Sequence, residues 1–354
     1  MSVKDQFYKP SIIQEFLKKA SNECIPLVTT IEITQGCNYK CHHCYNFDRT
    51  KEMPEAIKEN ALKPEEILSI IDQVAASGAF YINFTGGEAL LHPHLEDFIK
   101  RARTHHLEAR LKTNGSLLTV IRCEKLDLAG LASIDISLYG FSETSYQKLT
   151  GKEGMFGKTI DGIKNAIAQG FNVNINIILH RYNIDEIKQM ADFCIDHKVA
   201  FQFSTEITER YDDSSGSKDF EITTKQFQEQ LAGEYAEVFM TLNPDKALQC
   251  SCAKSVCGIS YSGEVFPCIG APIASGNLRE KTFAEIWKNS EVLNKIRNLK
   301  RDDFKSCQTC EYIEFCSRSS GSIYTNTKEY TGCDSSTLQQ AKIRHGFFKN
   351  QNKN

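Results

Sequence analysis

The sequence lacks the features that would direct it into a membrane, onto a nucleic acid or out of the cell. No apolar run is long enough to cross a bilayer, and the N-terminus has no charged segment followed by an apolar one. The net charge of the 354 residues is only −3, and no block of lysine and arginine stands out. Internal repeats and low-complexity segments are also missing. These absences favour an ordinary globular protein of the cytoplasm, long enough for one large domain and a smaller one.

Cysteine is what the sequence has in excess, with 14 residues. A secreted disulfide protein would explain them, but the chain length, the missing signal peptide and the clustered spacing argue against it. In a reducing compartment, clustered cysteines indicate metal or iron–sulfur ligation. Eleven of the 14 fall in two regions with motif-like spacing. The other three carry no motif, and Cys194 has the helical apolar surroundings of a small buried residue; these three are Cys24, Cys123 and Cys194.

Strand-like and helix-like patterns alternate through the first two thirds of the chain. Six segments are predicted to be strands, at residues 26–34, 79–85, 107–113, 133–138, 172–179 and 199–204. Helical patterns lie between them, among them residues 63–75, 156–169 and 184–197. Strands that alternate with helices predict crossover connections and a parallel sheet. Six such units are too few for a closed eight-stranded barrel, so the predicted fold class is α/β, a partial (β/α)6 TIM-like barrel.

A change in composition predicts where the barrel ends. Residues 211–219 are polar and rich in glycine and serine, which is typical of a loop or junction, and a helix is expected at about 223–241. Eight cysteines then fall between residues 250 and 333. The expected domains are a lead-in at 1–25, the barrel at 26–245, a cysteine-rich C-terminal module at 246–340 and a polar tail at 341–354.

Cys37, Cys41 and Cys44 follow directly after the first predicted strand with the spacing C-x3-C-x2-C. Three thiolates on one tight loop can face a single centre, and a cubane [4Fe–4S] cluster held by three of them keeps one iron without a protein ligand. A zinc site is the alternative, because His42 and His43 lie inside the loop. Adjacent histidines between the cysteines cannot easily fold back onto the same metal, which favours the cluster.

This loop resembles the signature of radical S-adenosylmethionine (SAM) enzymes, although His43 stands where that family usually has an aromatic residue. The resemblance implies that the open iron chelates the amino and carboxylate groups of SAM. One-electron reduction would then release a 5′-deoxyadenosyl radical, which abstracts a hydrogen atom from the substrate. That chemistry belongs to the cofactor, and the protein contributes positioning.

Small and polar residues stand at the ends of the next three predicted strands. Each group could be ordinary turn chemistry by itself, but the carboxyl ends of parallel strands share one edge, where ligands bind. Gly86-Gly87-Glu88 resembles the family motif that binds the SAM ammonium, and the resemblance assigns Asn114 and Ser137 to SAM as well. His180, past the fifth strand, is as consistent with packing as with function. No catalytic acid or base can be chosen from the sequence.

The C-terminal cysteines resemble a SPASM domain, which carries one or two auxiliary [4Fe–4S] clusters. The resemblance assigns one cluster to Cys307, Cys310, Cys316 and Cys333. Ser320 stands where the family has a further cysteine that closes the other cluster. That other cluster is therefore expected to use Cys250, Cys252, Cys257 and Cys268. An iron left open, or bound by Ser320 or by substrate, is an alternative, as is zinc in this half of the chain.

Radical SAM proteins with SPASM domains mostly modify ribosomally made peptides or proteins, so the resemblance implies oxidative crosslinking or dehydrogenation of such a substrate. No leader-binding domain fits before the first strand, which implies a separate leader-binding protein or direct recognition by the barrel. A flavodoxin- or ferredoxin-type electron donor is expected, and no nucleic acid or membrane partner. The alternatives are a radical SAM dehydrogenase of a small molecule and a zinc-rich, non-catalytic binding protein.

Metal analysis separates these interpretations. Anaerobically prepared protein should be brown and hold about 12 irons per chain, because three cubanes contain about four irons each. Replacing Cys37, Cys41 and Cys44 by alanine should abolish the formation of 5′-deoxyadenosine from SAM, measured by chromatography. A colourless protein loaded with zinc would rule out the radical chemistry.

Overall fold

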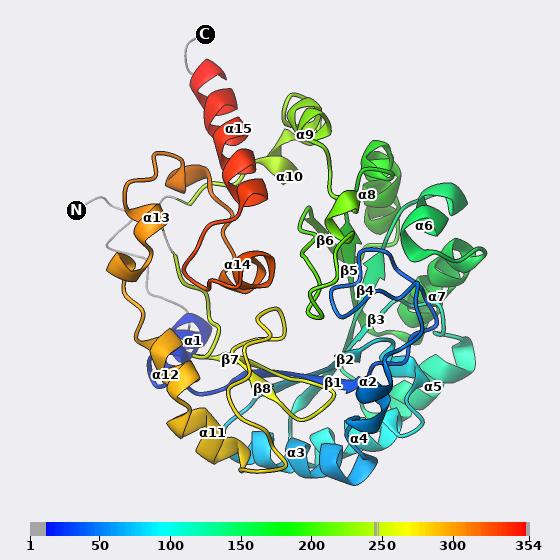
Figure 1. Ribbon diagram of the computed structural model, residues 1–354. Coiled ribbons are helices and arrows are strands. Elements are labelled where there is room, and N and C mark those ends of the chain that lie inside the picture. Colours follow the sequence, from blue (N-terminus) through cyan, green and yellow to red (C-terminus); the bar gives the residue numbers. More distant parts are fainter. Residues whose placement is uncertain (1–11, 244–245, 247, 352–354) are drawn as a thin grey trace.

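One curved sheet of eight strands forms the centre of the protein, seen in a computed structural model that describes residues 12–243, 246 and 248–351 (Figure 1). The strand order is β6-β5-β4-β3-β2-β1-β7-β8. The strands are β1 (Val28–Thr34), β2 (Tyr81–Gly86), β3 (Glu108–Thr113), β4 (Ser133–Leu138), β5 (Asn172–Ile178), β6 (Ala200–Ser204), β7 (Val256–Ile259) and β8 (Val265–Phe266). Strands β1 to β6 pair in parallel with their neighbours in the sequence. The six predicted strands and the α/β fold class, a partial barrel, are confirmed.

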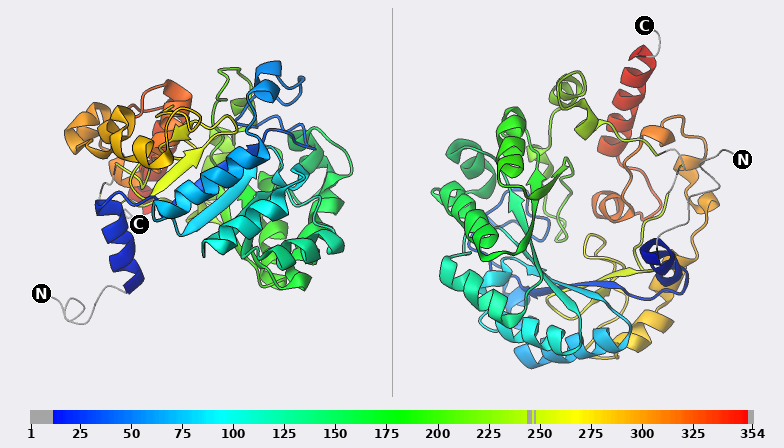
Figure 2. Two further views of the ribbon diagram at one scale, coloured as in Figure 1. Left: turned by 90° about the horizontal axis from the view of Figure 1, so that it is seen from below. Right: turned by 180° about the vertical axis from the view of Figure 1, so that it is seen from behind.

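Helices cover the outer, convex side of this sheet (Figures 1 and 2). They are α3 (Pro64–Ala76), α4 (Leu95–Thr104), α5 (Val120–Ala129), α6 (Glu143–Thr150), α7 (Met155–Gln169) and α8 (Ile187–Asp196). The sequence predicted α3 and α7 to within two residues, and a 3-10 turn (Ile184–Glu186) starts the helix predicted at 184–197. Pro64 stands at the first position of α3 and explains why that helix begins there. Gly130 follows α5 in the left-handed conformation and explains why that helix ends.

The two faces of the sheet differ in polarity. Successive residues of a strand point to opposite sides, and the side chains toward the helices are apolar and buried, as with Ala109, Leu111, Ile134 and Ile136. The opposite side, which we call the inner face, is polar and carries Thr30, Asn83, Lys112, Asp135, Asn174, Asn176 and Gln202. A closed barrel of this type is filled with branched apolar side chains. This inner face is instead built for polar contacts.

Strands β7 and β8 extend the sheet although they lie within the predicted C-terminal module. β7 runs parallel to β1, with Val28 opposite Val256 and Ile31 opposite Ile259, and β8 is antiparallel to β7. Strands of four and two residues are too short to show a periodicity, so the sequence did not predict them. The barrel and the C-terminal module therefore share one sheet, while the domain boundaries themselves stay a prediction.

The C-terminal half faces the open side of the barrel (Figures 1 and 2). Its helices are α11 (Phe283–Asn289), α12 (Glu291–Arg297), α13 (Lys305–Gln308), α14 (Ser320–Thr327) and α15 (Ser335–Gln351). Residues 341–351 of the expected polar tail form the second part of α15, where Ala341 and Arg344 are buried. Residues 352–354 lie outside the described chain.

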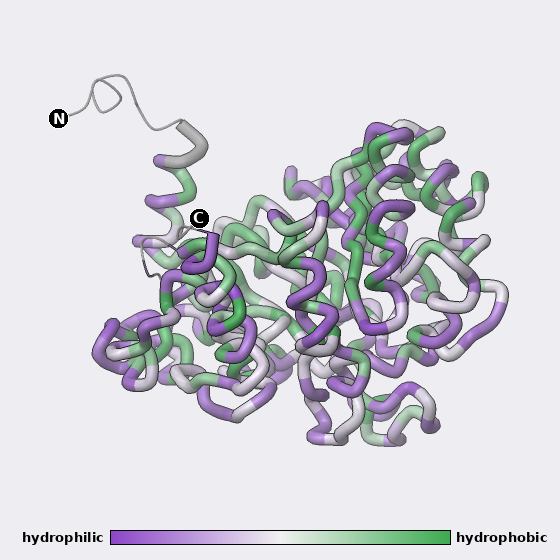
Figure 3. Tube along the Cα trace, turned by 90° about the horizontal axis from the view of Figure 1, so that it is seen from above, coloured by the Kyte–Doolittle hydropathy of each residue, from purple (hydrophilic) through white to green (hydrophobic). Residues whose placement is uncertain are grey.

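Four shorter or peripheral helices complete the description. The single helix expected at 223–241 is divided into α9 (Thr224–Leu231) and α10 (Ala236–Phe239), and Gly233 lies in the interruption. Helix α1 (Ile12–Asn22) lies in the lead-in and projects from the remaining chain (Figure 3). Helix α2 (Glu55–Glu59) follows the first cysteine motif. Among the described residues, no helix is both long and apolar enough to span a bilayer.

The packing of the outer face predicts a contrast between two leucines. Leu111 on β3 is 0% exposed and Leu128 on α5 is 85% exposed. Leu111→Ala should lower the free energy of unfolding by about 2–5 kcal/mol, because it leaves a cavity under the helices. Leu128→Ala should change it by less than about 0.5 kcal/mol. Denaturant unfolding followed by tryptophan fluorescence measures both, and equal losses would contradict this packing.

Candidate active site

The three N-terminal cysteines lie together at the carboxyl end of β1, in a segment we call the cysteine loop (residues 35–44). Cys37, Cys41 and Cys44 all line one cavity of about 140 Å³. The same cavity is lined by residues from the ends of β2, β3 and β4, which are Thr85, Gly86, Gly87, Lys112, Thr113, Asn114, Ser137 and Tyr139. The structure thus brings together residues that are far apart in the sequence, because parallel strands end at one edge.

Backbone hydrogen bonds hold the cysteine loop against the end of α6. Lys40 N donates to Thr150 O at 3.0 Å and His42 N donates to Leu149 O at 2.9 Å. The His42 ring stacks on Phe220, with 5.1 Å between ring centroids. His42 is not among the residues that line the cavity, so of the two loop histidines only His43 does.

Arg49 is a buried cation beside the cysteines, and no sequence motif pointed to it. Its Nε donates to Cys44 Sγ at 3.2 Å, and its Nη2 donates to Gln35 Oε1 at 3.0 Å. Burial raises the pKa of Cys37 to about 11 and that of Cys41 well above its usual range. These thiols need a positive partner to ionise, and a bound metal centre is the strongest such partner.

Gly86 and Gly87 allow the end of β2 to press against the cysteine loop. A Cβ on Gly87 would overlap the carbonyl oxygen of Gly36, and one on Gly86 would overlap that of Thr34. Gly87 N donates to Thr34 O at 2.7 Å, and Glu88 N donates to Gly36 O at 2.7 Å. Any side chain at Gly87 would push the two loops apart.

Glu88 lies beneath the cavity instead of in its wall. Its buried carboxylate accepts hydrogen bonds from Thr113 Oγ1 at 2.7 Å, Asn114 N at 2.9 Å and Leu90 N at 3.0 Å. Burial raises its pKa, and these donors act in the opposite direction. Glu88 thereby ties the end of β2 to the end of β3. Its predicted contact with SAM stays a prediction.

The other predicted SAM residues do line the cavity. Asn114 Nδ2 donates to Asn38 Oδ1 at 2.9 Å, so Asn114 also anchors the cysteine loop. Two buried polar atoms in the cavity wall, His43 Nδ1 and Asn46 Nδ2, have no hydrogen-bond partner among the described residues. His180 is different: it is fully buried with its Nε2 2.8 Å from Tyr139 O, which is a structural role.

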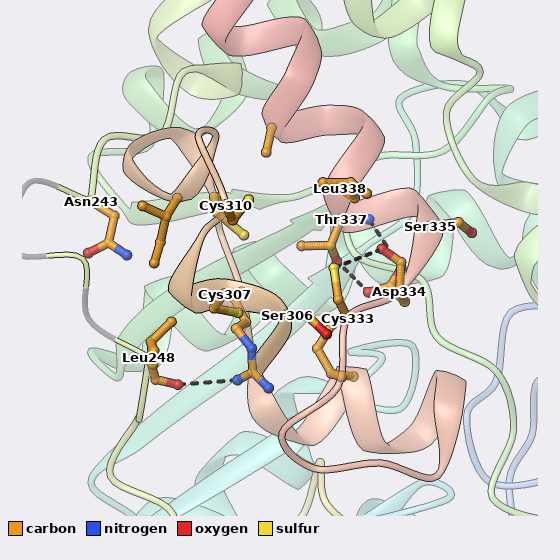
Figure 4. A pocket seen from close by; sticks show the side chains of 15 residues that line it. Asn243, Leu248, Ser306, Cys307, Cys310, Cys333, Asp334, Ser335, Thr337 and Leu338 are labelled. Carbon is orange, nitrogen blue, oxygen red and sulfur yellow. Dashed lines mark hydrogen bonds between the residues drawn. The ribbon is translucent and has the colours of Figure 1, made fainter. Parts of the chain in front are cut away.

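A second cavity, of about 430 Å³, brings together four C-terminal cysteines (Figure 4). Its wall includes Cys307, Cys310, Cys316 and Cys333, the complete set that the sequence grouped. Arg318 also lines it, and its Nη1 donates to Leu248 O at 3.2 Å. No three His, Cys, Asp or Glu side chains in the described part of the chain are placed to share one metal ion. In a cubane the thiolates bind different iron atoms, so they need not converge on one point.

The remaining four C-terminal cysteines are not all brought together. Cys250 Sγ lies 3.0 Å from Cys252 Sγ, and hydrogen bonds with Cys250 and Cys268 raise the pKa of Cys252. Cys257, on β7, points toward Thr29, with 3.2 Å between its Sγ and Thr29 Oγ1. A Cβ placed on the next residue of β7, Gly258, would meet the backbone of Cys268 and Ile269. Because successive strand residues face opposite sides, Cys257 points away from the other three cysteines.

Ser320, at the start of α14, is fully buried. Its Oγ accepts a hydrogen bond from Arg318 Nη1 at 2.6 Å. Ligation of this auxiliary site by Cys250, Cys252, Cys257 and Cys268 stays a prediction, with Cys257 turned toward Thr29 on β1.

Comparison with known proteins agrees with this geometry. The sequence profile of the radical SAM superfamily matches residues 31–194, and that of an iron–sulfur cluster-binding SPASM domain matches residues 250–311. The chain therefore contains a radical SAM domain and a SPASM domain. It is accordingly an enzyme whose cofactors are [4Fe–4S] clusters and SAM.

Three similar proteins illustrate the range of this group. An "AdoMet-dependent heme synthase" of Methanosarcina barkeri is 27% identical, over 86% of this chain and 94% of its own. A "PqqA peptide cyclase" of Gluconobacter oxydans is 25% identical, over 82% of this chain and 84% of its own. The crystal structure of Streptococcus suis SuiB bound to the precursor peptide SuiA has a TM-score of 0.63 and 18% identity, over 94% of this chain and 82% of that one, which shows a shared fold.

The residues of the radical SAM site fit these cofactors. Three thiols share one cavity wall, a guanidinium contacts one of them, and two buried polar atoms point to a polar ligand. When bound, the cluster and SAM supply a radical that abstracts hydrogen. The residues of this chain hold the loops in register around them and exclude water.

Gly87→Ala should separate the cysteine loop from β2 and reduce 5′-deoxyadenosine formation by at least about tenfold, since misplacement of about 1 Å can cost about 100-fold. Gly157→Ala on α7 is the matched control, because a Cβ there meets no atom within 4 Å. The uncoupled cleavage of SAM under dithionite measures both variants. Equal activities would mean that the close contact at Gly87 is not needed.

Proposed function

We propose that this enzyme oxidatively modifies a ribosomally made peptide or protein, by crosslinking or by dehydrogenation. The observation that carries the proposal is the polar inner face of the barrel. Lys112 Nζ donates to Asp135 Oδ2 at 2.8 Å, and Asn174 Nδ2 donates to Asp135 Oδ1 at 3.3 Å. Gln202 donates to Asn176 one strand further on. Lys112 also lines the radical SAM cavity, so this polar row begins at the reaction centre.

Side-chain amides and charges at this position suit a peptide. An amide presents a donor and an acceptor, which match the N–H and C=O groups of an extended backbone. The peptide cyclase among the relatives acts on PqqA, as its name states. Auxiliary clusters support the oxidative outcome, because they can accept the electron that remains after hydrogen abstraction.

The assignment of ligands follows the geometry. We assign the radical cluster to Cys37, Cys41 and Cys44, and SAM to Gly86, Gly87, Asn114 and Ser137, with Glu88 acting through the backbone of Asn114. One auxiliary cluster is assigned to Cys307, Cys310, Cys316 and Cys333. The other is assigned to Cys250, Cys252 and Cys268, with a fourth position that Cys257 does not reach.

The proposal includes the partners and the setting of the reaction. A flavodoxin- or ferredoxin-type protein would supply the electron for SAM cleavage, and a separate protein would present the leader segment of the substrate. The barrel (26–245) would hold the reaction centre and the module (246–340) the auxiliary clusters. Every described cysteine is a free thiol, which suits a reducing cytoplasm.

A small-molecule oxidation is the second candidate, because a heme synthase is among the relatives. A tetrapyrrole is a large flat ring that needs an apolar or aromatic wall. The inner face instead offers Lys112, Asp135 and three amide side chains, Asn174, Asn176 and Gln202. This polarity favours the peptide.

Co-expression with short peptides encoded beside this gene tests the proposal. The modified peptide should lose about two hydrogens, or 2 Da, per crosslink or double bond, measured by mass spectrometry. The Cys37→Ala variant is the control and should leave the peptide mass unchanged. A product of unchanged mass, or turnover of a tetrapyrrole and of no peptide, would contradict it.

A further inference from the structure

The segment after β6 connects the two cysteine-bearing parts of the chain. We call residues 209–213 the crosspiece. On one side, Arg210 Nη2 donates to His42 O at 2.8 Å and Tyr211 N donates to Tyr45 O at 2.7 Å. Both acceptors belong to the segment that contains Cys41 and Cys44. The crosspiece therefore touches the backbone of the radical cluster site directly.

On the other side, the crosspiece contacts the C-terminal module. Glu209 N donates to Asn326 Oδ1 at 2.9 Å, and Asp213 forms an ion pair with Lys328. Tyr211 OH donates to Ile269 O at 2.5 Å. Ile269 is the residue after Cys268, so the hydrogen bond from Tyr211 reaches the neighbour of a predicted cluster ligand. The crosspiece therefore contacts the backbone beside both cysteine sites.

Tyr211 is the residue that makes contacts in both directions. Its ring centroid is 5.0 Å from that of Tyr45, which follows Cys44 in the chain. Burial raises the pKa of Tyr211 well above its usual range, so its hydroxyl stays protonated and donates to Ile269. The path from Cys44 through Tyr45, Tyr211 and Ile269 to Cys268 consists of covalent bonds, one ring contact and two hydrogen bonds.

Arg210 anchors the crosspiece through side-chain hydrogen bonds. The Arg210 side chain is buried, and its guanidinium donates to Ser215 O and to Ser214 Oγ as well as to His42 O. Ser217 Oγ donates to Thr208 O at 2.7 Å and closes the same turn. Side-chain hydrogen bonds thus tie the crosspiece to the turn that follows it and to the cysteine loop.

We propose that Tyr211 is a positioning residue that couples the two cluster sites, so that an occupied auxiliary site at Cys268 tightens SAM binding at the cysteine loop. Such coupling is reciprocal, because each site stabilises the arrangement that the other needs. The proposal concerns the cofactor sites and does not depend on the class of substrate, so its failure would leave the peptide proposal standing.

A double-mutant cycle tests the coupling. SAM affinity is measured in the anaerobic, cluster-loaded protein from the change in the electron paramagnetic resonance spectrum of the reduced radical cluster. Tyr211→Phe and Cys268→Ala should each weaken SAM binding by about 5- to 20-fold, in the lower part of the range of about 5- to 150-fold that is usual for coupled sites. The double variant should bind SAM no more weakly than the weaker-binding single variant, because either substitution already breaks the connection between the two cysteine sites. Tyr81→Phe, at the far end of β2, is the control and should bind SAM like the wild type.

Two outcomes of the cycle would overturn the proposal: an unchanged SAM affinity in Cys268→Ala, or losses that multiply in the double variant. Hydrogen exchange provides a readout that does not need a loaded enzyme. In metal-free protein, Tyr211→Phe should speed the exchange of amides in residues 35–44 by about 5- to 20-fold while Tyr81→Phe does not. Equal exchange in the two variants would show that the bond from the Tyr211 hydroxyl to Ile269 O does not stabilise the cysteine loop, and would overturn the proposal.

Discussion

The contact between the end of β2 and the cysteine loop is the constraint on which the site depends. Gly87 lies so close to Gly36 that no side chain fits between them, and two backbone hydrogen bonds, from Gly87 and Glu88, fasten the loops together. Glu88 extends this fixation to β3 through Thr113 and Asn114. The wall that presents three thiols and the wall that presents polar strand ends are therefore held by one continuous set of hydrogen bonds. A ligand that spans both walls meets a preorganised site.

The open form of the barrel gives the sheet two different faces. Helices need an apolar surface beneath them, and the outward residues of β3 to β5 supply it. With only six parallel strands before the C-terminal module, the inner side is not closed into a packed core. Polar side chains can therefore occupy it and bond to one another across neighbouring strands. The same geometry that leaves the barrel incomplete makes room for a polar substrate next to the radical site.

The C-terminal module is part of the same body and not a separate attachment. β7 pairs with β1, the strand that leads into the cysteine loop, and the crosspiece joins that loop to the backbone beside Cys268. Trp287 Nε1 adds a hydrogen bond to Cys24 O at 2.5 Å. The pairing of β1 with β7 and the contacts of the crosspiece thus connect regions that are more than 200 residues apart in the sequence. Such connections are expected where two redox centres must keep a fixed relation.

The sequence by itself determined the alternation of strands and helices, the parallel α/β class, and the residues Cys37, Cys41 and Cys44, because these depend on periodicity and local spacing. The resemblance to a SPASM domain also grouped the four cysteines that line the second cavity, Cys307, Cys310, Cys316 and Cys333. Only the tertiary structure decided the features that depend on packing between distant parts of the sequence. It showed β7 and β8 in the barrel sheet, Arg49 beside Cys44, and Glu88 beneath the cavity. It also showed that Cys257 points toward Thr29. The side of the sheet that a strand residue faces depends on how the strand pairs with its neighbours, and no local sequence pattern records that pairing.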